Sequence, residues 1–166
     1  MSWMLVQFPD AASRFVGPDL LKRPKGRSTC SPVGLARKFT PKEESFLKAN
    51  EVCRFATVSK GGKPQVTPVI YAMDKGAFVI ATDYGTKKLK NVKENANVAL
   101  VVDQFHPNKA VMIEGTCRVY ERGAEYLRLL KILFERFETY RKNPWGEGES
   151  PIFRVAPTKT VSWGLG

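Results

Sequence analysis

Two β-rich runs joined by a short glycine-containing turn form the feature of this sequence that most limits its fold. The runs fill residues 52–73, and a Lys-Gly-Gly-Lys segment at residues 60–63 separates them. This spacing predicts a β-hairpin, because glycine supplies the backbone conformations that a tight turn needs. A further Asp-Lys-Gly turn at residues 74–76 predicts that residues 77–82 form a third strand, antiparallel to the second.

The rest of the chain continues with more strands and few helices. Residues 97–103 and 110–121 are β-rich, residues 123–142 place apolar side chains at helical spacing, and residues 152–163 predict one bent strand or two short ones. One face of residues 110–121 carries the expected core side chains, which are Val111, Ile113, Gly115, Cys117 and Val119.

This order of elements predicts a mainly β fold with helices. We expect a split β-barrel of about six mostly antiparallel strands, with one short helix after strand three and one long helix near the C-terminus. A doubly wound parallel sheet does not fit, because it needs a helix between most of its strands.

The chain divides near Thr40 into an extension and a folded domain. Residues 1–39 contain four prolines and a basic patch at residues 22–27 but no sustained periodicity, which predicts a basic N-terminal extension. Thr40, Pro41 and Glu43 predict a capped helix start, with the helix running to about Asn50. We therefore assign residues 40–166 to the domain.

Charge and rare residue types limit the possible functions. Lys and Arg number 27 against 16 acidic residues, a net charge of +11 that favours polyanions, phosphorylated small molecules or anionic membrane surfaces. No apolar run approaches the roughly 20 residues of a membrane-spanning helix. Three scattered cysteines indicate a reducing, cytoplasmic location, and His106 as the only histidine excludes a histidine metal cluster, so no metal is expected.

A lysine-rich segment follows the third predicted strand, at residues 83–95. If Thr86 caps a helix there, Lys87 and Lys88 lie in its first turn, and the buried face consists of Leu89, Val92 and Ala96. The helix dipole disfavours a cation at that end by roughly 0.3–1 kcal/mol. A bound phosphate would reverse this penalty, with the hydroxyl of Thr86 or Thr82 and the backbone N–H groups completing the site. A solvated basic helix is the alternative.

Two other features belong to the same region. Lys90 and Lys93 point elsewhere on the predicted helix and are expected to face solvent. Pro68 lies in the middle of the second strand, where it removes a ladder donor, so the strand lies at an edge or beside a ligand. Because strands two and three are expected to pair, Pro68 and residues 82–88 could line one site.

Residues 51–121 reproduce this succession of strands, turns and helix, and they resemble the pyridoxamine 5′-phosphate oxidase-like family of FMN-binding split barrels. The resemblance implies a homodimer with two cofactors at the subunit interface. It also implies that residues 66–71 lie along the isoalloxazine ring, that Ala81 and Thr82 flank the ribityl phosphate, and that Lys87 and Lys88 bind the phosphate. The expected cofactor-binding residues are Val66, Thr67, Pro68, Val69, Ala81, Thr82, Lys87 and Lys88.

Some positions depart from the family pattern. Val66 stands where the true oxidases have arginine, the strand that begins at Ala110 lacks their glutamine, and their C-terminal substrate motif is missing. We therefore expect that the chain is not a true pyridoxamine phosphate oxidase. No side chain stands out as a catalytic acid or base; Tyr71 and Arg54 are possible substrate contacts, and Trp163 is expected to have a structural role.

These observations predict a flavin-dependent oxidoreductase with an unknown small-molecule substrate. FMN is the expected cofactor, and an 8-hydroxy-5-deazaflavin is the alternative. A non-catalytic flavin or haem carrier, or a nucleic-acid-associated protein, is the other class of function. Haem is disfavoured because His106 is the only imidazole, and nucleic-acid binding would depend on the extension. We expect a homodimer, and neither membrane nor nucleic acid as a partner.

Overall fold

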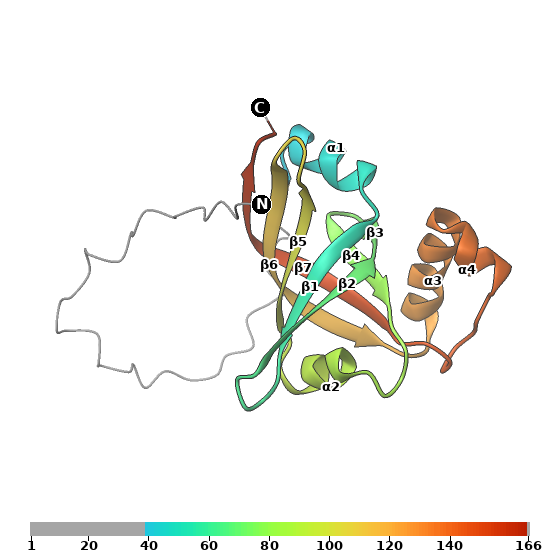
Figure 1. Cartoon of the computed structure of the whole chain (residues 1–166). Helices are drawn as coiled ribbons and strands as arrows, with labels where there is room; N and C mark the ends of the chain where they lie inside the picture. The colour runs from blue at the N-terminus through green and yellow to red at the C-terminus, as the bar shows by residue number, and fades with distance from the viewer. Residues whose placement is uncertain (1–38, 166) are drawn as a thin grey trace, which may run out of the picture. The chain divides into compact units, whose positions relative to one another are not determined.

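Seven antiparallel strands and four helices make up the part of the chain that the computed structural model describes, residues 39–165 (Figure 1). The strands are β1 (Val52–Val58), β2 (Pro64–Ile70), β3 (Ala72–Asp74), β4 (Ala77–Ala81), β5 (Asn97–Gln104), β6 (Lys109–Tyr120) and β7 (Ile152–Trp163). The helices are α1 (Pro41–Ala49), α2 (Lys87–Glu94), α3 (Ala124–Arg136) and α4 (Glu138–Lys142).

The strands form one sheet in the order β2-β1-β5-β6-β7-β4-β3. The sheet curls, so that β2 and β4 contact each other although they lie near opposite ends of this order (Figure 1). No ladder joins these two strands within residues 39–165, which leaves the barrel split along this seam. The expected mainly β, antiparallel architecture is confirmed as a curled half-barrel, with seven strands in place of about six, and the short helix α2 follows the fourth strand rather than the third.

The expected antiparallel hairpin of the third predicted strand is confirmed only at the end of the second β-rich run. Residues 77–81 pair with β3, which is that end, and with β7, but not with β2. The reason is a bend at Tyr71, which divides the second β-rich run into β2 and β3. The Tyr71 backbone N–H still donates to Glu51 O on the β1 side, at 2.9 Å, whereas Ala72 already pairs with Val79 of β4.

Local signals at the start of the domain are confirmed. The Thr40 hydroxyl accepts from the Glu43 backbone N–H at 3.3 Å, and a Glu43 carboxylate oxygen accepts from the Thr40 N–H at 2.9 Å. Pro41 occupies the first turn, and α1 ends at Ala49. These reciprocal bonds satisfy two donors that a helix start otherwise leaves unpaired.

The long helix expected at residues 123–142 is divided into α3 and α4. Phe137 lies between them in an extended conformation, with φ −117° and ψ 115°. Its ring is buried and lies 5.4 Å from the ring of Tyr140, so packing rather than a proline or glycine turns the chain here. The α3 side chains that form the second core cluster, against β3, β4 and β7, are Tyr126, Leu129, Leu130 and Leu133.

The alternation expected along residues 110–121 is confirmed in β6. Val111, Ile113 and Cys117 are buried there. The last strand is a single strand whose register shifts beside Gly115, where a Cβ would lie 2.7 Å from Ala156 O. Burial raises the pKa of the Cys117 thiol to about 12, consistent with the expected packing role.

Two further expectations concern the N-terminal extension and membrane-spanning helices. The predicted extension, apart from Phe39, lies outside the described residues, so the division near Thr40 stays a prediction. No helix within residues 39–165 is long and apolar enough to cross a membrane.

Candidate functional site

A cavity of about 340 Å³ opens along the split seam of the barrel, where the ends of β2 and β4 meet the start of α2. The curl of the sheet brings β2 and β4 together there, whereas the expected hairpin joins β4 only to β3, the end of the second β-rich run. Its lining residues are Val69, Ile70, Ala81, Thr82, Asp83, Lys88, Tyr140, Trp145 and Ser150.

The predicted site residues separate into two groups. The structure brings Val69, Ala81, Thr82 and Lys88 together in the cavity. The remaining ones lie outside its lining, on the edge strand or on the exposed start of α2: Val66, Thr67, Pro68 and Lys87.

The turn between β4 and α2 is held by two hydroxyl groups. Thr82 is buried, and its backbone N–H donates to Pro151 O at 3.0 Å. Thr86 occupies the N-cap position of α2 without capping it; its hydroxyl instead donates to Asp83 O at 2.9 Å and lies 3.2 Å from the Thr82 hydroxyl. The first-turn N–H groups of α2 therefore have no side-chain acceptor from the N-cap.

The start of α2 is unusually positive for a helix. Its first turn contains no acidic side chain, and Lys88 is half-buried against the cavity while Lys87 is exposed. Both Lys90 and Lys93 are exposed, as expected, and Lys93 pairs with Glu121 at 3.1 Å. Positive charge at this helix end is unfavourable unless an anion is present.

The strand β2 offers a free edge to the seam. It pairs only with β1 within the described residues, so the edge position expected from Pro68 is confirmed. Val66 is 61% exposed on the outer face. The Thr67 hydroxyl is buried and has no hydrogen-bond partner among residues 39–165. Burying a hydroxyl without a hydrogen-bond partner costs free energy, which suggests that a bound group supplies the partner.

These features fit a phosphorylated planar cofactor. Thr82 and Thr86 supply hydroxyls, Lys88 supplies a cation, and the start of α2 supplies backbone donors, which together are the donor set that phosphate binds. The free edge of β2 and the Thr67 hydroxyl can form hydrogen bonds with the polar rim of a ring. Among the described residues that line the cavity, Asp83 is the one acidic side chain.

One wall of the cavity comes from the C-terminal part of the chain and was not expected from the sequence. The Trp145 ring lies 4.7 Å from that of Tyr140 and 5.0 Å from that of Phe134, each edge to face. The buried Tyr126 hydroxyl holds the following loop, 2.8 Å from Gly146 O and 3.0 Å from Ser150 O. Burial and, to a smaller degree, the Asp83 carboxylate raise the pKa of Tyr140. The aromatic residues after α3 were the sequence signal for this wall, but no local pattern predicted that they lie near the end of β4.

A buried asparagine on α2 was also missed. Ala96, which was expected on the buried face, lies beyond the helix and is exposed. Asn91 is buried beside Leu89 and Val92. Its Nδ2 donates to the Thr57 hydroxyl at 3.0 Å and approaches the Gln65 Oε1 at 3.5 Å.

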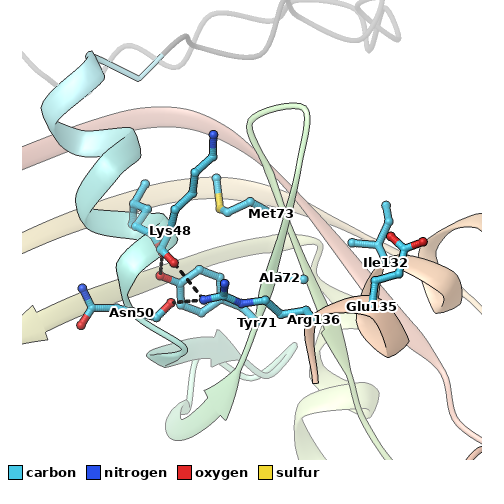
Figure 2. Close-up of a pocket in the computed structure, with 9 residues that line it drawn as sticks. Lys48, Asn50, Tyr71, Ala72, Met73, Ile132, Glu135 and Arg136 are labelled. Carbon is cyan, nitrogen blue, oxygen red and sulfur yellow. Dashed lines mark hydrogen bonds between the residues drawn. The ribbon is translucent and has the colours of Figure 1, made fainter. Parts of the chain in front are cut away.

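A second cavity, of about 300 Å³, lies between α1, β3 and α3 (Figure 2). Tyr71 forms part of its wall, but the side chain is only 1% exposed and its hydroxyl donates to Leu47 O at 2.6 Å. Arg136 donates to Lys48 O at 2.8 Å and to Asn50 O at 3.4 Å (Figure 2). Tyr71 therefore connects β3 to α1, which is a packing role.

The other candidates lie at the surface. Arg54 forms an exposed ion pair with Asp103 at 3.4 Å. Trp163 is 44% exposed, and its indole N–H donates to Asn108 Oδ1 at 3.1 Å. His106 is exposed in the turn between β5 and β6 and lies against Phe105. Residues 39–165 contain no group of three or more side chains placed to hold a metal ion.

Comparison with known proteins gives one family and a consistent fold. The family model described as pyridoxamine 5′-phosphate oxidase matches residues 39–164. A 5a,11a-dehydrotetracycline/5a,11a-dehydrooxytetracycline reductase from Streptomyces rimosus is 31% identical over 136 residues, covering 76% of this chain and 84% of the relative.

Two solved structures share the fold at low identity. The haem storage protein HutZ from Vibrio cholerae matches with a TM-score of 0.65 and 17% identity, covering 73% of this chain and 92% of that one. An F420 reductase matches with a TM-score of 0.57 and 24% identity, covering 74% and 98%.

Proposed function

The chain belongs to the pyridoxamine 5′-phosphate oxidase family, and we propose that it is an oxidoreductase that binds a phosphorylated flavin. FMN is the proposed cofactor, with 8-hydroxy-5-deazaflavin as the alternative. The cavity along the split seam carries the proposal, because it joins a phosphate-binding donor set to the free edge of β2. The reductase name of the Streptomyces relative supports the same class of reaction.

Each proposed contact follows from the position of a residue. Thr82 and Lys88 hold the phosphate inside the cavity, and the exposed Lys87 adds a second cation from the solvent side. Val69 and Ala81 flank the cofactor between phosphate and ring.

The ring lies along the edge strand at residues 66–68. The cofactor, when bound, supplies hydride transfer, while the protein binds it, orients it and excludes water. Thr67 provides a hydroxyl for the polar rim of the ring.

Pyridoxamine phosphate oxidation itself is not proposed. Val66 carries no charge that could meet a substrate phosphate, and Ala110, at the start of the long β6 strand, is buried. The substrate is a small molecule that enters beside the cofactor.

We also propose that the active unit is a homodimer. Several strand residues leave apolar side chains in water: Val52 is 45% exposed, Val66 61% and Val161 42%. A second copy of the chain would cover such side chains and close the solvent side of the edge strand. Light scattering in solution tests this directly, and a monomer at working concentrations would contradict it.

The visible spectrum of the purified protein tests the cofactor. We expect flavin absorption in the protein as isolated, or saturable binding when FMN or the deazaflavin is added to the cofactor-free protein. A separate titration with haem is the control, because haem gives a different absorption band. Binding of haem in place of either flavin, or of nothing at all, would refute the proposal.

A further inference from the structure

Asn91 occupies a position that favours an apolar residue. It is one of three buried residues of α2, with Leu89 and Val92, and it is 2% exposed. Burying a carboxamide is unfavourable unless its polar atoms find partners. An aliphatic side chain of similar size would fill the space without that cost, so the presence of asparagine needs an explanation other than packing.

The partners of Asn91 lie on two strands at once. Thr57 of β1 and Gln65 of β2 are directly opposite each other in the antiparallel ladder. The Asn91 carboxamide donates to the Thr57 hydroxyl, which is itself buried, and approaches the Gln65 side-chain oxygen. Asn91 thus hydrogen-bonds α2 to β1 and, through a longer contact of 3.5 Å, links it to β2. Apolar contacts alone would let the helix slide or rotate, whereas these bonds are directional.

The link joins the two halves of the proposed cofactor site. Lys87 and Lys88 precede Asn91 by four and three residues, so each of them is a neighbour of Asn91 along the helix surface. Gln65 lies two residues before Thr67 on the same face of β2. The phosphate end of the site is therefore attached to α2, the ring end to β2, and Asn91 connects them.

We propose that Asn91 is a positioning residue that sets the spacing between the phosphate site and the ring site without touching the cofactor. This inference rests on the proposed function. A ligand with two binding ends gains affinity over either end alone only when the distance between the two sites matches the ligand. Loss of the link should therefore weaken FMN, which uses both ends, and spare riboflavin, which has the ring and ribityl chain without the phosphate.

Three variants separate positioning from general stability. Asn91→Leu removes the bonds and keeps the volume, and Gln65→Leu cuts the β2 side of the link at a half-buried residue. Val92→Ala is the matched control, because it weakens the apolar packing of the same helix without changing the bonds. Equilibrium dissociation constants for FMN and riboflavin and the thermal midpoint are measured for each.

We expect Asn91→Leu to lower FMN affinity by roughly tenfold, the scale seen when a residue that orients a binding group is removed. Riboflavin affinity should stay within about twofold of wild type. Gln65→Leu should act in the same direction, and Val92→Ala should lower the thermal midpoint while keeping the ratio of the two affinities. Equal losses for both ligands, or no loss, would overturn the inference.

The wild-type protein distinguishes the two proposals. If it prefers FMN over riboflavin and Asn91→Leu keeps that preference, only the positioning role fails. If the wild-type protein shows no preference for the phosphorylated ligand, the proposed phosphate site fails, and the role of Asn91 fails with it.

Discussion

Replacing Lys88 by alanine should have opposite effects on binding and on stability. The side chain is half-buried in the cavity at the start of α2, a helix whose first turn holds no acidic residue. With a phosphate bound, its charge-assisted hydrogen bond is worth about 1.5–3 kcal/mol, so its loss should weaken FMN binding by roughly 10- to 150-fold. Without ligand, removing the cation from this helix end should stabilise the fold by about 0.3–1 kcal/mol.

Two measurements on one protein preparation test this. Fluorescence titration gives the dissociation constant for FMN, and urea unfolding of the cofactor-free protein at low salt gives the free energy of unfolding. Lys90→Ala is the control, because Lys90 is exposed on the same helix and does not line the cavity. Lys87→Ala should weaken FMN binding less than Lys88→Ala. Unchanged FMN affinity in Lys88→Ala, or a less stable cofactor-free protein, would refute the reasoning.

Two further substitutions test the packing around the site. The buried Asp74 carboxylate accepts hydrogen bonds from Arg128 at both oxygens, at 2.7 and 2.9 Å. These bonds are the main cause that lowers the pKa of Asp74, and Arg154 lowers it further. The ionised group therefore stabilises the fold above its ordinary pKa of about 3.9 and loses this effect as the pH falls through the lowered pKa. Asp74→Asn should lower the free energy of unfolding by about 2–4 kcal/mol at pH 7. In strong acid the urea unfolding curves of the variant and the wild type should converge. A difference that stays constant at all pH values would contradict this. Tyr71→Phe should lower the free energy of unfolding by about 1 kcal/mol, because the bond to Leu47 O is lost. FMN affinity should stay unchanged, and a weaker affinity would indicate that Tyr71 belongs to the binding site.

Local sequence signals predicted local structure well. The Thr40–Glu43 capping box depends on side chains three residues apart, and the structure contains both of its bonds. The alternation along β6 also predicted which side chains are buried, because a half-buried strand has a period of two. The edge position of β2 followed from Pro68 for an equally local reason.

Long-range features could not be derived in the same way. The pairing of β4 with β7 joins segments more than 70 residues apart, and nothing in residues 77–82 selects that partner over β2. Phe137 ends α3 through its own packing, and no proline or glycine in the sequence predicts this helix end. Tyr140 and Trp145 reach the cavity only because that break turns the chain back toward the end of β4.

A crystal structure of the protein with FMN tests the central claim most directly. We predict that the phosphate lies in the cavity at the split seam, within hydrogen-bond distance of Thr82 and Lys88, with the ring along the edge of β2. A phosphate bound elsewhere, for example in the cavity between α1 and α3 beside Arg136 (Figure 2), would contradict the account.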